Sequence, residues 1–172
     1  SGGLLMNGSV AAFLGFDRVL TEEERRKISN YLAPIYGLKI GHLAALGDSI
    51  TAGGGSVANP WPNQLNTSLG PLWDAKNFAV SGKRADQVFS EQWAALNTGA
   101  YRRGFNFIAV LAGINDIRAF KETSAQVIND LQTLYDRVLT AGDNNRLIAL
   151  PLLPNKGDNG YDTDRQTKID EV

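Results

Sequence analysis

Four mostly apolar runs alternate with helix-like segments along this chain, and this alternation restricts the fold more strongly than any other feature. The runs cover residues 39–46, 76–80, 106–112 and 146–152. All are mostly apolar rather than alternating, which is typical of strands buried on both faces of a parallel sheet. Strands that alternate with helices also imply right-handed crossover connections. The sequence therefore predicts an α/β fold, a three-layer αβα sandwich around a parallel sheet.

Two segments between the runs predict helices that cover this sheet, and a further helix is expected to begin at Thr163. One of the two runs from Asp86 to Leu96. The other is capped by Thr123 and Gln126, which have the spacing of a capping box. Its apolar residues fall on one face at helical spacing. They are Val127, Ile128, Leu131, Leu134, Tyr135 and Val138.

The N-terminal part of the chain follows a different pattern. A short strand is predicted over Ser9–Phe16. A capping box at Thr21 then begins a helix that is predicted to end near Leu32, because Pro34 follows.

This strand and helix resemble the C-terminal end of a concanavalin-A-like (LamG-type) jelly-roll domain. We therefore predict that residues 1–38 are the remnant of a preceding lectin-like domain or a linker, and that residues 39–172 form the α/β domain. The alternative is an N-terminal strand and helix that pack onto the α/β domain.

Three of the four apolar runs stop at a loop that carries a group suited to acyl transfer. Ser49 follows the first run, Gly82 the second and Asn115 the third. Ligands of open α/β sheets bind outside the carboxyl ends of the strands, so this topology would bring the three residues together. Acyl transfer needs a nucleophile and hydrogen-bond donors for the developing oxyanion. Each residue also has a simpler interpretation: Ser49 as a helix N-cap, Gly82 as a strand-end turn, and Asn115 as an Asx turn or cap.

The same loops resemble sequence blocks of the SGNH, or GDSL-type, family of serine esterases and lipases. The first block matches Gly47-Asp48-Ser49-Ile50-Thr51, the second lies around Gly82, and the third matches Gly113-Ile114-Asn115-Asp116. The resemblance covers roughly residues 39–172. It implies the flavodoxin-like SGNH hydrolase fold.

The resemblance also implies a role for each residue of these blocks. Ser49 would be the nucleophile. The oxyanion hole would consist of the Ser49 and Gly82 backbone N–H groups and the Asn115 side chain. Asp48 and Asp116 are expected to be hydrogen-bond acceptors that shape the loops rather than proton carriers.

The fourth block of the family, Asp-x-x-His, has no match before the last residue, Val172. The only histidine, His42, precedes Ser49 by seven residues on the same predicted strand. At about 3.3 Å per residue, the two residues lie about 15–23 Å apart and on opposite faces. We therefore expect that His42 is not the catalytic base and that the catalytic Asp and His lie beyond Val172. The α/β domain would then be incomplete at its C-terminus, and this stretch alone would be close to inactive.

Composition argues against several other classes of function. The net charge is −1 and the Lys and Arg residues are scattered, so the sequence shows no basic patch for nucleic acid. There is no Cys and one His, so we expect no disulfide and no metal site. No run approaches the roughly 20 apolar residues of a transmembrane helix. The loop after Gly47 has neither a Gly-Lys-Ser/Thr nor a Gly-x-Gly-x-x-Gly pattern, so no nucleotide or other cofactor is expected.

We therefore predict a serine hydrolase that acts on a small-molecule or carbohydrate ester through an acyl-enzyme. The jelly-roll-like N-terminus favours an acetylated carbohydrate and an extracellular or virion-associated protein. Trp61 and Trp73 are candidates to line a sugar-binding cleft, although Trp73 also fits a place in the core. The alternative is a non-catalytic carbohydrate-binding or structural module with a degenerate hydrolase domain.

Overall fold

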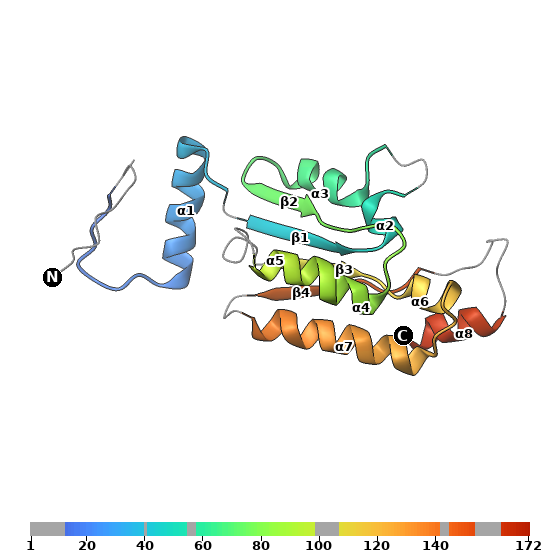
Figure 1. Ribbon diagram of the computed structural model, residues 1–172. Helices are drawn as coiled ribbons and strands as arrows, with labels where there is room; N and C mark the ends of the chain where they lie inside the picture. The colour runs from blue at the N-terminus through green and yellow to red at the C-terminus, as the bar shows by residue number, and fades with distance from the viewer. Residues whose placement is uncertain (1–12, 40, 55–57, 99–106, 142–144, 154–162) are drawn as a thin grey trace.

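The computed structural model describes residues 13–39, 41–54, 58–98, 107–141, 145–153 and 163–172 (Figure 1). Within these ranges the strands form one sheet with the order β2-β1-β3-β4. The strands are β1 (Gly41–Gly47), β2 (Trp73–Asn77), β3 (Phe107–Leu111) and β4 (Arg146–Ala149). All neighbouring pairs are parallel, and Ala45 lies opposite both Asn77 and Ala109. The predicted parallel α/β fold is therefore confirmed.

The predicted second strand, 76–80, is wrong, because β2 lies earlier in the chain. β2 is at the edge of the sheet, where the polar side chains of Asp74 and Lys76 alternate with Trp73 and Ala75. The Asp74 and Lys76 side chains form an ion pair at 3.4 Å. An edge strand needs no continuous apolar run, and the apolar residues after it belong to the loop.

The predicted fourth strand, 146–152, is also longer than the strand that forms. β4 ends at Ala149, and the Leu150 N–H donates one more hydrogen bond, at 2.9 Å, to the Val110 carbonyl. The next residue is Pro151, which has no N–H to continue the ladder.

The described helices lie between and after these strands. They are α1 (Glu22–Tyr36), α2 (Ser49–Ala52), α3 (Trp61–Leu69), α4 (Ala85–Gln87), η1 (Val88–Trp93), α5 (Ala94–Thr98), α6 (Ile114–Arg118), α7 (Ser124–Thr140) and α8 (Thr163–Glu171). The helix predicted over Asp86 to Leu96 is present as α4, η1 and α5 in succession, and η1 is a π-helical turn. The capping box of Thr123 and Gln126 at the start of α7 is present as predicted. None of the helices in the described ranges is both long and apolar enough to cross a membrane.

Both faces of the sheet are covered. On one face, the strands pack against α4, η1, α5, α6, α7 and α8. That core contains Ala44, Leu46, Ile108 and Val110 of the sheet with Val88, Trp93, Val127, Leu134 and Ile169 of the helices. On the other face, Leu43, Ala45 and Ala109 pack against Trp61 and Leu65 of α3. The sheet is therefore the middle of three layers, as predicted.

The apolar face of α7 is narrower than the sequence predicts. Val127, Leu131, Leu134 and Val138 are buried, but Ile128 is 43% exposed. Ile128 lines an open hollow beside the edge strand β4.

The helix α1 lies beyond the end of the sheet at which β1 begins (Figure 1). Its predicted capping box at Thr21 is confirmed. The predicted end near Leu32 is wrong, since α1 continues through Pro34 to Tyr36. Pro34 has no N–H for the carbonyl of Asn30, four residues earlier, but Asn30 is exposed, so water can satisfy that carbonyl. Of the strand predicted over Ser9–Phe16, residues 13–16 are not in a strand and the rest lies outside the described residues.

Candidate active site

The three candidate residues follow the carboxyl ends of three neighbouring parallel strands. Ser49 is the first residue of α2, and Asp48 alone separates it from the end of β1. Gly82 lies in the loop after β2, and Asn115 lies in α6 after β3. Figure 1 shows α2 and α6 beyond the same end of the sheet. The fold thus gathers the three residues at one edge.

Ser49 is held on a short helix that Asp48 caps. The Asp48 Oδ1 accepts the Ile50 N–H at 2.9 Å, and Asp48 is fully buried whereas Ser49 is half-buried. Burial raises the pKa of Asp48, and the hydrogen bond from Ile50 opposes this shift. The interpretation of Ser49 as the N-cap is therefore wrong, because the capping residue is Asp48.

The glycine-rich loop after α2 folds back over Ser49. The Gly54 N–H donates to the Ser49 carbonyl at 2.7 Å. A Cβ at position 54 would lie 2.8 Å from the Ser49 Cβ, which is closer than real side chains approach. Only glycine therefore fits beside Ser49 without moving it.

The end of β2 is tied to α2 by Asn77, whose role the sequence did not reveal. Its Nδ2 donates to the Thr51 carbonyl at 2.8 Å, and its Oδ1 accepts the Ala79 N–H at 3.0 Å. The Trp61 Nε1 donates to the Thr51 hydroxyl at 3.4 Å, so Trp61 lies close to this edge. Trp73 lies at the start of β2, at the opposite end of the sheet, and cannot line the same cleft.

Gly82 is exposed and has a φ of 81°. No atom of the described residues would lie within 4 Å of a Cβ at this position. Glycine is therefore required here by the left-handed backbone rather than by close packing. The next residue, Lys83, connects this loop to α6, because its carbonyl accepts the Asn115 Nδ2 at 2.9 Å.

An Asx turn would direct the Ile117 N–H to the Asn115 Oδ1, but this N–H donates to the Gly113 carbonyl at 3.3 Å, so the interpretation as an Asx turn is wrong. The N-cap of α6 is Gly113, so Asn115 is not the cap either. An amide NH₂ has two N–H donors, and Lys83 takes one of them.

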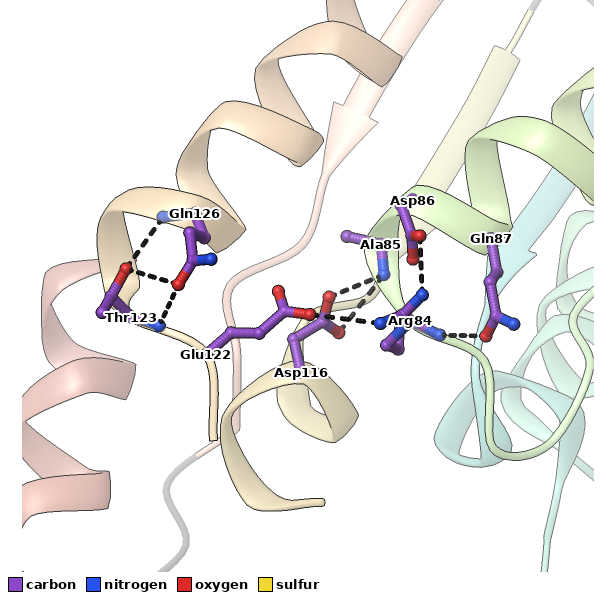
Figure 2. Close-up of polar contacts among 8 residues, drawn as sticks. All are labelled: Arg84, Ala85, Asp86, Gln87, Asp116, Glu122, Thr123 and Gln126. Atoms are coloured by element: carbon purple, nitrogen blue, oxygen red, sulfur yellow. Dashed lines mark hydrogen bonds and ion pairs between the residues drawn. The ribbon is translucent and has the colours of Figure 1, made fainter. Parts of the chain in front are cut away.

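Asp116 joins α6 to the start of α4 (Figure 2). Its two carboxylate oxygens accept the Ala85 N–H at 3.0 and 3.2 Å, and the residue is fully buried. Burial raises the pKa of Asp116, and the hydrogen bond from Ala85 opposes this shift. Asp116 is thus a hydrogen-bond acceptor that shapes the loop, as expected.

Arg84 adds ion pairs at the same place. It contacts Asp86 at 2.8 Å and Glu122 at 3.3 Å (Figure 2). Its guanidinium also lies 4.7 Å from the centre of the Phe120 ring. The carboxylates of Asp116, Glu122 and Asp130 lie within 4.8 Å of one another, as metal ligands would. The Ala85 N–H binds Asp116 and the Arg84 guanidinium pairs with Glu122, so two of these three carboxylates have partners within the protein.

His42 is the second residue of β1 and lies at the end of the strand away from Ser49. Its Nδ1 is 3.9 Å from the Asp74 Oδ2 on β2. This placement, far along the strand from Ser49, is as predicted.

Residues 45–172 match the family model of the GDSL-like Lipase/Acylhydrolase family. The chain belongs to this family. No curated protein matches its sequence.

Solved structures of SGNH-type hydrolases share the fold. The aryl esterase of M. smegmatis is 17% identical with a TM-score of 0.59, over 76% of this chain and 75% of that one. AlinE4, an SGNH-hydrolase family esterase, is 20% identical with a TM-score of 0.58, over 76% and 67%. A carbohydrate acetylesterase family member from Sinorhizobium meliloti is 18% identical with a TM-score of 0.52, over 69% and 67%. These similarities confirm the SGNH hydrolase fold.

Proposed function

We propose that this GDSL-family protein hydrolyses carboxylic esters through an acyl-enzyme on Ser49. The observation that carries the proposal is the position of Ser49. This residue is half-buried, follows the buried N-cap Asp48, and lies at the same edge of the sheet as Gly82 and Asn115. The family match covers all three residues.

In the first step, the Ser49 Oγ attacks the ester carbonyl and loses its proton to a base. The carbonyl oxygen becomes an oxyanion, and the alcohol then leaves with a proton as the acyl-serine forms. Water next attacks this acyl-enzyme, which releases the acid and regenerates Ser49.

Three donors are assigned to the oxyanion. The Ser49 N–H is at the first position of α2 and has no acceptor within the helix. The Gly82 N–H and the second N–H of the Asn115 amide complete the set. A donor of this kind contributes about 10²–10³ in kcat.

The base is not supplied by His42, which lies near the other end of β1. The resemblance to the family implies an Asp-x-x-His pair for this role, and the printed sequence contains no such block.

For the substrate, we propose an acetylated carbohydrate. The carbohydrate acetylesterase family member among the similar structures supports it. The sequence of residues 1–38 also resembles the end of a jelly-roll domain, although residues 13–16 do not form the strand that this resemblance predicts. Release of acetate from acetylated xylan, compared with hydrolysis of longer p-nitrophenyl esters, tests this assignment.

The nucleophile is tested with Ser49→Ala in the complete natural polypeptide that carries this sequence. Turnover of p-nitrophenyl acetate should be abolished because the attacking oxygen is gone. Ser68→Ala, an exposed serine on α3, is the matched control and should keep wild-type turnover. A Ser49→Ala variant with near wild-type kcat would overturn the proposal and favour a non-catalytic module.

A further inference from the structure

Gln92 binds both backbone groups of the residue that ends β1. Its Oε1 accepts the Gly47 N–H at 2.9 Å, and its Nε2 donates to the Gly47 carbonyl at 2.8 Å. Gln92 is only 5% exposed. The side-chain amide therefore supplies the acceptor for the Gly47 N–H and shares the Gly47 carbonyl with the Val80 N–H, which donates to it at 3.1 Å.

Gln92 provides the acceptor that the Gly47 N–H lacks because β2 ends at Asn77. Beyond β2, the N–H groups of Phe78 and Val80 still donate to the carbonyls of Ala45 and Gly47, at 2.9 and 3.1 Å. In a continuing parallel ladder, the Gly47 N–H would donate to the chain on this same side. It donates to Gln92 instead. A buried N–H without an acceptor is costly, and Gln92 removes that cost.

The π-helical turn η1 explains how Gln92 reaches Gly47. In η1, Val88, Gln92 and Trp93 are all buried. In an α-helix, which turns about 100° per residue, the side chains of Val88 and Trp93 would point about 140° apart, so Trp93 would turn away from the face that Val88 and Gln92 share. The wider π-turn lets all three face inward. Such turns occur frequently at functional sites.

One residue, Asp48, separates Gly47 from Ser49. Rotation of the Gly47 peptide would displace the Asp48 cap and, with it, the hydroxyl and N–H of Ser49. We propose that Gln92 is a positioning residue for the nucleophile: it fixes the Gly47 peptide groups so that Ser49 points at the substrate. This inference rests on the proposed role of Ser49.

Two substitutions test it in the complete natural polypeptide. Gln92→Leu keeps the approximate size of the side chain but removes both hydrogen bonds. We expect kcat for p-nitrophenyl acetate to fall about 10–100-fold with little change in KM, because a shift of about 1 Å at a reacting group has an effect of this size. Gln132→Leu on α7, at an exposed glutamine, is the matched control and should keep wild-type kcat.

The variant Gln92→Glu distinguishes a role of Gln92 in positioning Ser49 from a role in the stability of the fold alone. A protonated carboxyl accepts and donates like the amide, whereas a carboxylate can only accept. Burial raises the pKa of such a carboxyl. The kcat of Gln92→Glu relative to wild type should therefore be higher near about pH 5 than near about pH 8, and Gln92→Leu should show no such change.

Wild-type kcat in Gln92→Leu would overturn the inference. If Gln92→Leu fails to fold, a pH-independent ratio for Gln92→Glu would overturn it. Ser49→Ala is measured in parallel. If Ser49→Ala is inactive and the Gln92 variants are fully active, only the positioning role of Gln92 is contradicted. If Ser49→Ala is itself fully active, the proposed function is contradicted as well.

Discussion

Asp116 accepts the backbone N–H of Ala85 with both oxygens of its buried carboxylate, at 3.0 and 3.2 Å. The two residues are 31 positions apart in the sequence. Together with the hydrogen bond from Asn115 to the Lys83 carbonyl, this contact ties the loop that follows Gly82 to α6. The Gly82 N–H and the Asn115 amide are therefore held relative to each other by the residues next to them.

We predict that Asp116→Asn changes the pH dependence of stability. Burial raises the pKa of Asp116, so the folded protein binds this proton more tightly than the unfolded chain does. Between the ordinary pKa of an aspartate, about 4, and the raised value, stability therefore falls as the pH rises. Asp116→Asn keeps one acceptor oxygen for Ala85 and removes this dependence. The melting temperature of Asp116→Asn should increase relative to that of the wild-type protein as the pH rises. A difference in melting temperature that stays constant with pH would contradict the prediction.

We predict that Asn115→Ala lowers kcat for an ester by about 10²–10³ with little change in KM, because the amide would bind only the oxyanion of the transition state. Asn63→Ala, at an exposed position on α3, is the control and should leave kcat unchanged. Steady-state kinetics with p-nitrophenyl acetate measure both. A pure KM effect would instead identify Asn115 as a residue that binds the ground state.

The sequence predicts those parts of the fold that follow from local pattern. The buried strands β1 and β3 consist mostly of apolar residues, and the cap of α7 has a recognisable spacing, so the sequence predicts all three elements close to their true positions. β2 was misplaced because an edge strand alternates polar and apolar residues, which makes the apolar loop after it resemble a strand.

For the candidate site, the sequence predicts that three residues lie together at one edge of the sheet. Ser49, Gly82 and Asn115 stand out because each follows an apolar run. Gln92 does not, because its role depends on a π-helical turn and on a partner 45 residues away, which no spacing in the sequence reveals.

We predict that Gly54→Ala lowers activity more than it lowers stability. The new Cβ would lie 2.8 Å from the Ser49 Cβ, so the serine must shift, and a shift of about 1 Å costs about 10²-fold in rate. Gly70→Ala is an informative comparison, because Gly70 has a φ of 79° and no close neighbour in the described structure. That variant should lose stability, by about 1 kcal/mol, and keep kcat. Equal kcat in wild type and Gly54→Ala would show that the loop does not constrain Ser49.

We predict that the polypeptide of residues 1–172 hydrolyses p-nitrophenyl acetate slowly and that His42→Ala leaves its rate unchanged. His42 lies near the start of β1 beside Asp74, whereas Ser49 follows the other end of the strand, so the imidazole cannot accept the proton of Ser49. A hydrolase site that lacks one member of its triad retains only about 10³–10⁴ over the reaction in water, which comes from the oxyanion hole and binding. Initial rates of the wild-type, His42→Ala and Ser49→Ala polypeptides, corrected for the uncatalysed reaction, measure this. Fast hydrolysis that disappears in both variants would mean that His42 reaches Ser49, which is incompatible with the positions of both residues on β1 and α2.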